Sequence, residues 1–213
     1  MPSWDDLRQR LFGTPYEVWH DGIHEGQIDL ADPTALRAAL PEGLAEGDWV
    51  AAVAARRLAD PALLPLVAAR LGIGGGRFAV EAAQAIAELG GDRAAATAWV
   101  VEALGWGGWS DRLDVAMGLR HLPGEGVIEA LLAAVENDPE YLVRYHAAES
   151  LLHLGEVTPT DISLHPGIFS DLVAGADQEP TAEHHARHAC AAAALRALPA
   201  PRPGAATAQS GQL

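Results

Sequence analysis

Residues 142–155, LVRYHAAESLLHLG, predict one helix of a repeating unit. Four apolar side chains, spaced by four, four and three residues, form one stripe along an α-helix. They are Val143, Ala147, Leu151 and Leu154. Asp138 and Pro139 precede the stripe as a helix-start signal, because proline is accepted in a first turn. Gly155 marks the end, because a C-terminal cap often needs a positive φ.

Weaker copies of this stripe recur along the chain. Their closing leucines are at positions 58, 89, 122, 154 and 198, so successive copies are 31, 33, 32 and 44 residues apart. The copy that ends at position 89 has Phe78, Ala82, Ile86 and Leu89 in the four places. Each of the last four copies follows another apolar run, at residues 61–71, 93–104, 126–135 and 168–174. The unit is therefore helix–turn–helix, and a fixed period in this range is typical of a solenoid.

Residues 143–155 resemble the second helix of a HEAT repeat, in the short variety found in phycobilisome-lyase-like HEAT proteins. The family pattern is Val-Arg-x-x-Ala-Ala-x-x-Leu-x-x-Leu-Gly, and this segment fills each fixed position of it. The resemblance covers about residues 48–198, which we expect to form a single domain. It implies an all-α fold, an α-solenoid of about five helix pairs. It implies little about function, because HEAT arrays serve many unrelated roles.

The two ends of the chain depart from the repeat. We expect residues 1–47 to form an atypical cap, since an end repeat would otherwise expose its core. Ser3 is the predicted N-cap of a first helix, and Asp32 starts a helix that ends before Pro41. Residues 199–213 are rich in proline, alanine and glycine with almost no charge, so they predict a disordered tail.

The chain is acidic, with a formal net charge of −15, and all 14 of its basic residues are arginine. Nucleic-acid binding needs a basic face, so the charge argues against a general nucleic-acid binder. It permits a basic protein partner. Solubility alone explains the same charge, and the sequence leaves both interpretations open.

The single cysteine, Cys190, excludes an internal disulfide framework and is typical of a reducing compartment. Its alanine-rich surroundings predict a buried, inert thiol in a packed helix. The N-terminus, MPSWDDLRQRLFG, is charged and lacks the apolar region of a signal peptide. No apolar run is long enough to cross a bilayer, so we expect a cytoplasmic protein without a membrane segment.

A glycine-rich turn at residues 105–109, GWGGW, carries two tryptophans. One interpretation is that Trp106 and Trp109 form an exposed aromatic platform, since aromatic residues are enriched at binding hot spots. The other is that both rings fold back to fill gaps between repeats, since tryptophan is largely buried on average. A second glycine-rich segment, 72–76, lacks the Gly-Lys-Ser/Thr ending of a phosphate loop and predicts a connecting turn.

In HEAT arrays the second helices line the concave side, so the resemblance implies a binding face there. Aligning the copies places five residues in one column: Asp48, Ala79, Arg112, Arg144 and His188. Tyr145, His146 and Glu149 lie beside this column. For Arg144 the resemblance also implies a structural role, because the family arginine often makes ion pairs between repeats. The longer last interval places an insertion at residues 156–166, and such insertions often lie on the binding face.

Two groups of histidines have spacings that occur in metal sites. His20 and His24 are four residues apart with flanking acids, but nearby glycines disfavour the helix that would align them. His184 and His188 share a predicted helix face, with His185 beside them. A third ligand would have to come from elsewhere, and a solvated run of histidines is the alternative.

Two enzyme families with HEAT-like repeats are not supported by the residues. Deoxyhypusine hydroxylase resembles this repeat type and holds two irons with paired His-Glu dipeptides. The matching positions here are Tyr145-His146 and Asp114. HEAT-like DNA glycosylases need a basic groove, which the acidic composition disfavours. No Ser-His-Asp or Cys-His arrangement has usable spacing, so we predict no catalytic residue, no metal and no cofactor.

We therefore expect a non-catalytic protein-interaction module, an adaptor or regulator that binds another protein on its concave face. The predicted partner-binding residues are Trp106, Trp109, Arg112, Arg144, Tyr145, His146 and Glu149. The family resemblance implies one alternative, a lyase-like enzyme or enzyme accessory that handles a cofactor or tetrapyrrole. The net charge motivates another, an acidic inhibitor of a basic protein.

Overall fold

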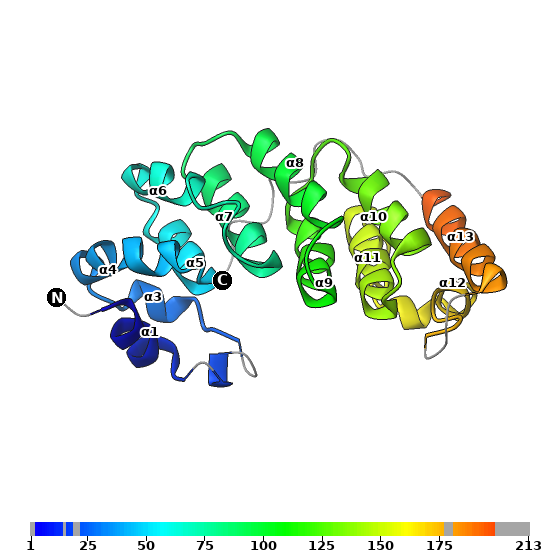
Figure 1. Cartoon of the computed structure of the whole chain (residues 1–213), viewed down its shortest axis with the longest axis horizontal. Helices are drawn as coiled ribbons and strands as arrows, with labels where there is room; N and C mark the ends of the chain where they lie inside the picture. Colours follow the sequence, from blue (N-terminus) through cyan, green and yellow to red (C-terminus); the bar gives the residue numbers. More distant parts are fainter. Residues whose placement is uncertain (1–2, 15, 19–21, 177–180, 199–213) are drawn as a thin grey trace. The chain divides into compact units, whose positions relative to one another are not determined.

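The computed structural model describes residues 3–14, 16–18, 22–176 and 181–198. Regular structure in these residues is helical, without a strand, which confirms the predicted all-α class. None of their helices is both long and apolar enough to span a membrane. The chain divides into two compact units, unit 1 at Met1–Val127 and unit 2 at Ile128–Leu213 (Figure 1). The predicted tail, 199–213, lies outside the described residues.

Unit 1 consists of short helices joined by tight turns. Its α-helices are α1 (Trp4–Phe12), α3 (Gly26–Asp29), α4 (Pro33–Ala45), α5 (Trp49–Leu58), α6 (Leu64–Ala68), α7 (Gly76–Glu88), α8 (Arg93–Ala103) and α9 (Trp109–Gly118). Two 3-10 turns, η1 (Pro61–Leu63) and η2 (Leu119–His121), accompany them. Helices α5, α7 and α9 pack in sequence, with α4 against α5, α6 against α7, and α8 against both α7 and α9 (Figure 1). Helices α4, α6 and α8 thus alternate along the chain with α5, α7 and α9.

The core of unit 1 is built from small and branched side chains. The four predicted stripe residues of α7, namely Phe78, Ala82, Ile86 and Leu89, are all buried. Gly118 in α9 faces Val80, where a Cβ atom on the glycine would lie only 2.4 Å from a valine methyl carbon. Helices α7 and α9 therefore approach so closely that no side chain fits at this position. The run at 61–71, which predicted one helix, is divided between η1 and the short α6.

The first helix packs against α4 through a buried tryptophan. Ser3 caps α1 by accepting a hydrogen bond from the backbone N–H of Asp6, as predicted. Trp4 is fully buried, and its ring lies against Gly43 of α4, where a Cβ atom would be 2.6 Å away. Its indole N–H donates to a carboxylate oxygen of Asp48 at 2.7 Å, which links α1 to the beginning of α5.

The prediction that Pro41 lies beyond the end of its helix is wrong. Asp32 caps the helix at its beginning, as expected, but α4 continues through Pro41 to Ala45. Pro41 is exposed, so water can satisfy the carbonyl that loses its backbone partner. Leu44, one turn later, is buried. Burial of the last turn of α4 outweighs the local cost of the proline.

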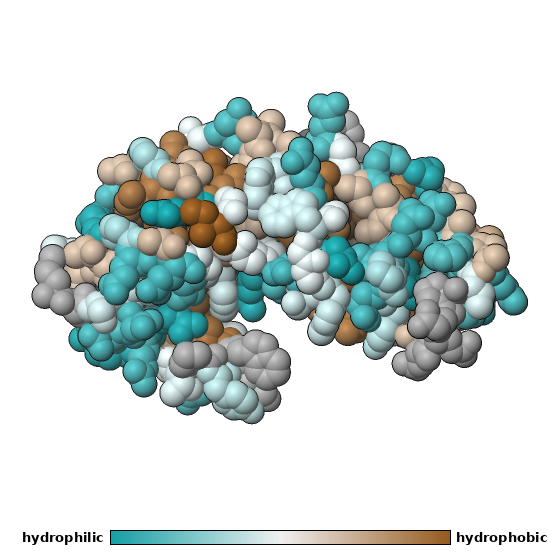
Figure 2. Space-filling model, viewed as in Figure 1, coloured by the Kyte–Doolittle hydropathy of each residue, from teal (hydrophilic) through white to brown (hydrophobic). Residues whose placement is uncertain are grey.

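Figure 2 shows that the face of unit 1 over α1, α3 and α4 is mostly hydrophilic, whereas apolar residues gather over α6 and α7. Leu66 in α6 and Ile73 before α7 are among the exposed large apolar side chains. Helix α3 is held to α5 by an ion pair of 2.9 Å between Arg56 and Glu25.

Unit 2 contains the two longest of the described helices, α11 (Tyr141–Leu154) and α13 (Ala182–Arg196), with the short α12 (Pro166–Leu172) between them in the chain. Helix α10 (Val127–Asn137) begins at the unit boundary and is followed by α11, η3 (Ile162–Leu164), α12 and α13. Helix α11 packs against η3, α12 and α13, and α12 packs against α13. Val143, Ala147 and Leu151 of the predicted stripe are buried, whereas Leu154 is only half-buried.

Several local predictions in unit 2 need correction. Gly155 has an ordinary φ of −80°, and the left-handed residue after α11 is Glu156, at φ 54°. Helix α11 begins at Tyr141 rather than at Pro139, because the carboxylate of Asp138 accepts the backbone N–H of Glu140 and forms a turn. Cys190 is exposed.

The insertion at 156–166 folds back through a short 3-10 turn. This turn, η3, lies at Ile162–Leu164. Asp161 is its cap, accepting from the backbone N–H of Ser163 at 2.9 Å. Ile162 is fully buried, so one apolar anchor holds the insertion against the helices.

Candidate functional site

The loops that precede α5, α7 and α9 lie side by side in unit 1. A Cβ atom on Gly47 would be 2.9 Å from the Cα of Gly74, so the first two loops touch. The backbone N–H of Gly76 donates to Oδ1 of Asp111 at 2.9 Å, which joins the second loop to α9. Five residues on or beside these loops form what we call the tryptophan edge: Trp49, Arg77, Trp99, Trp106 and Trp109.

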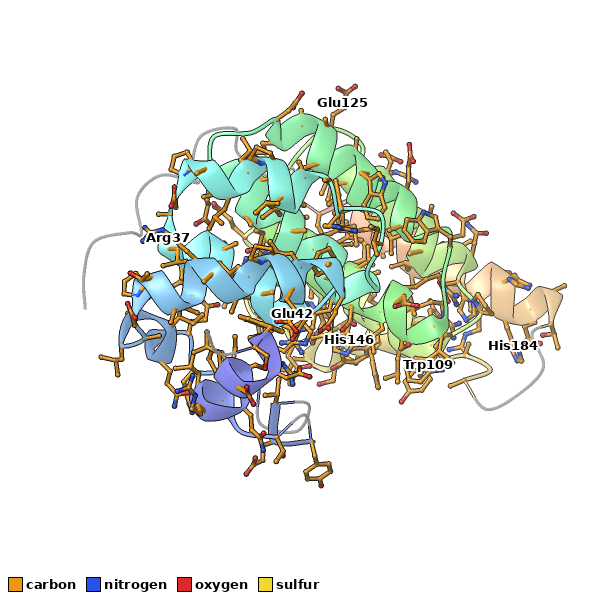
Figure 3. All side chains as sticks on the ribbon, turned by 60° about the vertical axis from the view of Figure 1, so that its left-hand side comes forward. Arg37, Glu42, Trp109, Glu125, His146 and His184 are labelled. Atoms are coloured by element: carbon orange, nitrogen blue, oxygen red, sulfur yellow. The ribbon has the colours of Figure 1, made fainter. Side chains whose placement is uncertain are left out.

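Both tryptophans of the glycine-rich turn are exposed. The exposed fraction is 44% for Trp106 and 51% for Trp109, which favours the platform interpretation over gap filling. Trp109 is the first residue of α9, with its side chain outside the ribbon (Figure 3). Trp106 contacts the half-buried Trp99 edge to face, with ring centroids 5.0 Å apart and planes at 77°. Trp99 thus supports one side of the Trp106 ring.

Asp111 fixes the backbone that carries these rings. Its Oδ2 accepts from the backbone N–H of Gly108 at 3.1 Å, while Oδ1 accepts from Gly76. A guanidinium N–H of Arg112 donates to the carbonyl of Gly107 at 3.2 Å, and Gly107 has a φ of +85°. A Cβ atom on Gly76 would lie 2.0 Å from the carbonyl oxygen of Asp111, so only glycine fits there. The turn is therefore preorganised rather than merely glycine-rich.

A cation–π contact lies at the other end of the tryptophan edge. The guanidinium carbon of Arg77 lies 3.6 Å from the ring centroid of Trp49. Asp114 lies nearby, and burial raises the pKa of its carboxyl, while the charge of Arg77 opposes this shift. The tryptophan edge thus combines aromatic faces with the cation of Arg77, and the carboxyl of Asp114 lies beside it.

The predicted column of binding residues is mostly interior, and this expectation needs correction. Ala79 is buried in α7. Asp48 caps α5 by accepting from the backbone N–H of Val50, and its second oxygen pairs with Arg8 at 2.8 Å. The alignment of repeats placed these residues on a helix face that neighbouring elements cover. Only Arg112 of this column belongs to the surroundings of the tryptophan edge.

Arg144, in unit 2, is a structural residue and is only 2% exposed. Its Nε donates to the carbonyl of Leu172 at 3.2 Å, and one Nη donates to the carbonyls of Asp138 and Pro139 at 2.8 and 3.0 Å. Burial lowers the pKa of the guanidinium. The expected structural role is therefore observed, although the partners are carbonyls rather than a carboxylate. Its place among the partner-binding residues is wrong, because no partner can reach it.

His188 repeats this arrangement in α13. It is 4% exposed, and its Nε2 lies 2.9 Å from the carbonyl oxygen of Ala174, so this nitrogen carries the hydrogen. Burial lowers the pKa of the imidazole. Arg144 and His188 therefore reach from two helices to the carbonyls of Leu172 and Ala174, at and just beyond the end of α12.

Tyr145, His146 and Glu149 form a half-buried polar cluster on α11. Nδ1 of His146 lies 3.0 Å from a carboxylate oxygen of Glu149, and the Tyr145 hydroxyl donates to Asp161 at 3.3 Å (His146 is labelled in Figure 3). Burial, together with the charges of Glu149 and Asp161, raises the pKa of Tyr145 to about 12. These side chains bond to each other and to the insertion, so they stabilise unit 2 locally.

The histidine groups give no metal centre in the described part of the chain. There, no group of three His, Cys, Asp or Glu side chains is arranged to hold an ion. His184 lies in the first turn of α13, where its ring nitrogen accepts the backbone N–H of Thr181 at 3.3 Å. His20, the first member of the other candidate pair, lies outside the described residues.

Comparison of the chain with protein-family models, with curated proteins and with solved structures gave no match. The resemblance of residues 143–155 to a HEAT repeat therefore stays a prediction from the sequence.

Asp111 is a functional residue that the sequence analysis did not predict. The signal for it was a helix-start pattern, an acid three residues after Gly108.

Proposed function

We propose that this chain is a non-catalytic protein-interaction module that binds another protein through the tryptophan edge of unit 1. One observation carries the proposal: two half-exposed tryptophans stand on a glycine turn whose backbone is fixed by Asp111 and Arg112. Exposed aromatic rings on a preorganised backbone lose little conformational entropy when a partner covers them.

The energetics favour a binding role for these rings. Trp106 and Trp109 would each hide on the order of 100 Å² from water in a complex. At the usual transfer coefficient this burial stabilises the complex by about 2 kcal/mol for each ring. Tryptophan is among the residues most enriched at interface hot spots. Two adjacent rings therefore suffice for the centre of an interface, with the surrounding charged residues as its rim.

The scaffold that we infer is a HEAT-like array. The alternation of first and second helices in unit 1, and the α12–α13 pair in unit 2, support this inference. The binding surface then lies where second helices begin, at the loops before α5, α7 and α9. This replaces the column of residues along the helix face, since its members Ala79, Arg144 and His188 are buried.

The test is a capture experiment with matched variants, followed by a direct binding measurement. Wild type, a Trp106→Ala/Trp109→Ala variant and a Leu30→Ala control are each immobilised and exposed to extract of the native host. Leu30 is a suitable control because it is an 87% exposed apolar residue of unit 1 that follows the end of α3 and is not part of these loops. A protein retained by wild type and control but lost by the double variant is then purified and titrated by calorimetry.

We expect that purified protein to bind wild type and the Leu30 control equally and the double variant at least about tenfold more weakly. Equal binding to all three would show that the tryptophan edge is not the interface. A preparation that carries a bound small molecule at near one-to-one ratio and no protein would instead support the cofactor-handling alternative.

A further inference from the structure

The chain itself shows which kind of group the tryptophan edge accepts. At one end, the guanidinium of Arg77 lies over the ring of Trp49 at 3.6 Å. Trp49 is the first residue of α5, and Trp109 is the first residue of α9. The residues before them, Asp48 and Gly108, both have extended backbones. The two rings thus leave their helices from equivalent positions, and one of them already binds an arginine.

The charge around the exposed rings favours a cation. Residues 1–127 contain 18 acidic residues against 10 arginines, a net charge of −8. The carboxylate of Asp111 bonds to Gly108 in the turn that carries the rings, and it interacts with the half-buried carboxyl of Asp114. Glu102 is exposed near the end of α8. Arg77 and Arg112, the cations of this region, make contacts within the chain, to Trp49 and to the carbonyl of Gly107. An approaching positive group therefore meets an attractive field.

The geometry of the rings separates arginine from the other candidates. A guanidinium is planar, weakly hydrated and able to stack on an indole face, whereas an ammonium is compact and strongly hydrated. Nucleic-acid bases also stack on tryptophan, but the phosphates that accompany them are repelled by the acidic surface. A purely apolar segment would use the rings but not the carboxylates around them.

We propose that the partner presents arginine side chains that stack on Trp106 and Trp109, so that the tryptophan edge binds a short arginine-containing segment. This inference rests on the proposed function and names the chemistry of the partner. Trp99 supports Trp106 from one side, at a centroid distance of 5.0 Å, which leaves the outer part of the ring for the arginine. The carboxylates of Asp111 and Asp114 attract the positive charge at long range, and the two rings distinguish arginine from lysine.

The experiment uses three labelled peptides of identical length, in which glycine–serine spacers separate two copies of arginine, lysine or citrulline. Lysine keeps the charge without the planar group, and citrulline keeps the planar group without the charge. The full chain is titrated with each peptide by fluorescence anisotropy. In parallel, the indole N–H signals of its six tryptophans are followed by NMR, with Trp106→Phe and Trp109→Phe variants for assignment.

We expect the arginine peptide to bind at least about fivefold more tightly than the lysine and citrulline peptides. This difference in affinity is the size expected when two exposed arginine–indole contacts are weakened or lost. It should shift the indole signals of Trp106 and Trp109, and binding should weaken with salt. The Trp106→Phe/Trp109→Phe variant should bind with intermediate affinity and the alanine double variant weakly, while Leu30→Ala should match wild type. Thermal unfolding of each variant verifies that it is folded.

The outcomes separate this inference from the proposed function. If the captured partner needs the two tryptophans but the three peptides bind alike, the arginine inference fails and the interface stands. If the arginine and lysine peptides bind the alanine double variant as tightly as they bind wild type, charge alone attracts the peptides and the inference fails. If neither the captured partner nor any peptide depends on the rings, both proposals fail.

Discussion

The beginning of α9 in unit 1 and the polar residues of α11 and α13 in unit 2 both belong to the binding surface expected from the sequence, but their side chains differ in exposure. Trp106 and Trp109 are apolar and are exposed, whereas Arg144 and His188 are polar and are buried. The exposed rings stand on a backbone that Asp111 fixes, and the buried side chains satisfy carbonyls at the end of α12. Both groups therefore reverse the usual relation between polarity and burial.

The buried polar side chains and the exposed apolar rings have different physical explanations. A buried polar residue is explained when it has hydrogen-bonding partners, as Arg144 has in the carbonyls of Leu172, Asp138 and Pro139. An exposed pair of tryptophans on a fixed turn has no such internal explanation, and we propose that a partner outside the chain covers it. Stability experiments should therefore detect Arg144, and binding experiments should detect Trp106 and Trp109.

The largest effect on stability is expected for Arg144→Met. The substitution leaves the carbonyls of Leu172, Asp138 and Pro139 without this donor in a buried site. We expect the free energy of unfolding to fall by about 3 kcal/mol. Urea denaturation measures it, with Arg144→Lys as the variant that keeps the charge and recovers part of the loss. A loss below about 1 kcal/mol would contradict the structural role.

A smaller loss is expected for Asp111→Ala, which removes the acceptor for the backbone N–H groups of Gly76 and Gly108. The expected loss is about 2 kcal/mol, because each of these two backbone N–H groups loses the carboxylate that accepts its hydrogen bond. The matched control is Asp92→Ala, where the carboxylate caps α8 through a single backbone N–H and the loss should be about half as large. Equal losses in the two variants would show that Asp111 acts only as a local cap. Hydrogen exchange at Gly76 distinguishes the two cases directly.

His188 makes the stability of unit 2 depend on pH. Burial lowers its pKa, and the hydrogen bond to Ala174 opposes this shift without reversing it. The neutral ring is therefore favoured in the folded chain, and its contribution is present above the unfolded value of 6.5 and lost as the pH falls below it. Unfolding in urea at pH 7 and pH 5 should show a smaller acid loss for His188→Gln than for wild type. An unchanged acid loss would exclude His188 as a cause.

The smallest effect on stability is expected for Trp106→Ala/Trp109→Ala. Half of each ring is already in water, and the buried support comes mainly from Trp99. We expect the free energy of unfolding to change by less than about 1 kcal/mol. The same urea experiment measures it. A loss as large as that of Arg144→Met would mean that the rings hold unit 1 together.

The sequence predicted the helices of the repeat better than their surroundings. The stripe through Phe78, Ala82 and Ile86 is buried as expected, because its period of 3.6 residues follows from helix geometry alone. Cys190 was misplaced because α13 is rich in alanine on every side, so its sequence does not mark the buried face. The face is instead set by His188, Ala191 and Leu195.

The candidate site was predicted only in part. The sequence contains both tryptophans, but the turn that carries them is held by a hydrogen bond between Asp111 and Gly76, which are 35 residues apart. A pattern within residues 105–109 cannot report that contact. Arg144 was assigned to the surface because its column was inferred from the repeat, whereas its burial follows from the position of α12. Local patterns thus specify helices, and contacts between distant loops specify the site.

We propose that Trp106 and Trp109 bind a partner, whereas Arg144 and His188 maintain the fold. The most direct test is calorimetric titration of the purified partner into wild type and into the Trp106→Ala/Trp109→Ala variant, with urea unfolding of both on the same preparation. We expect binding to weaken at least about tenfold, or ~1.4 kcal/mol, with unfolding nearly unchanged. Unchanged affinity, or a loss of affinity accompanied by an equal loss of stability, would contradict the account.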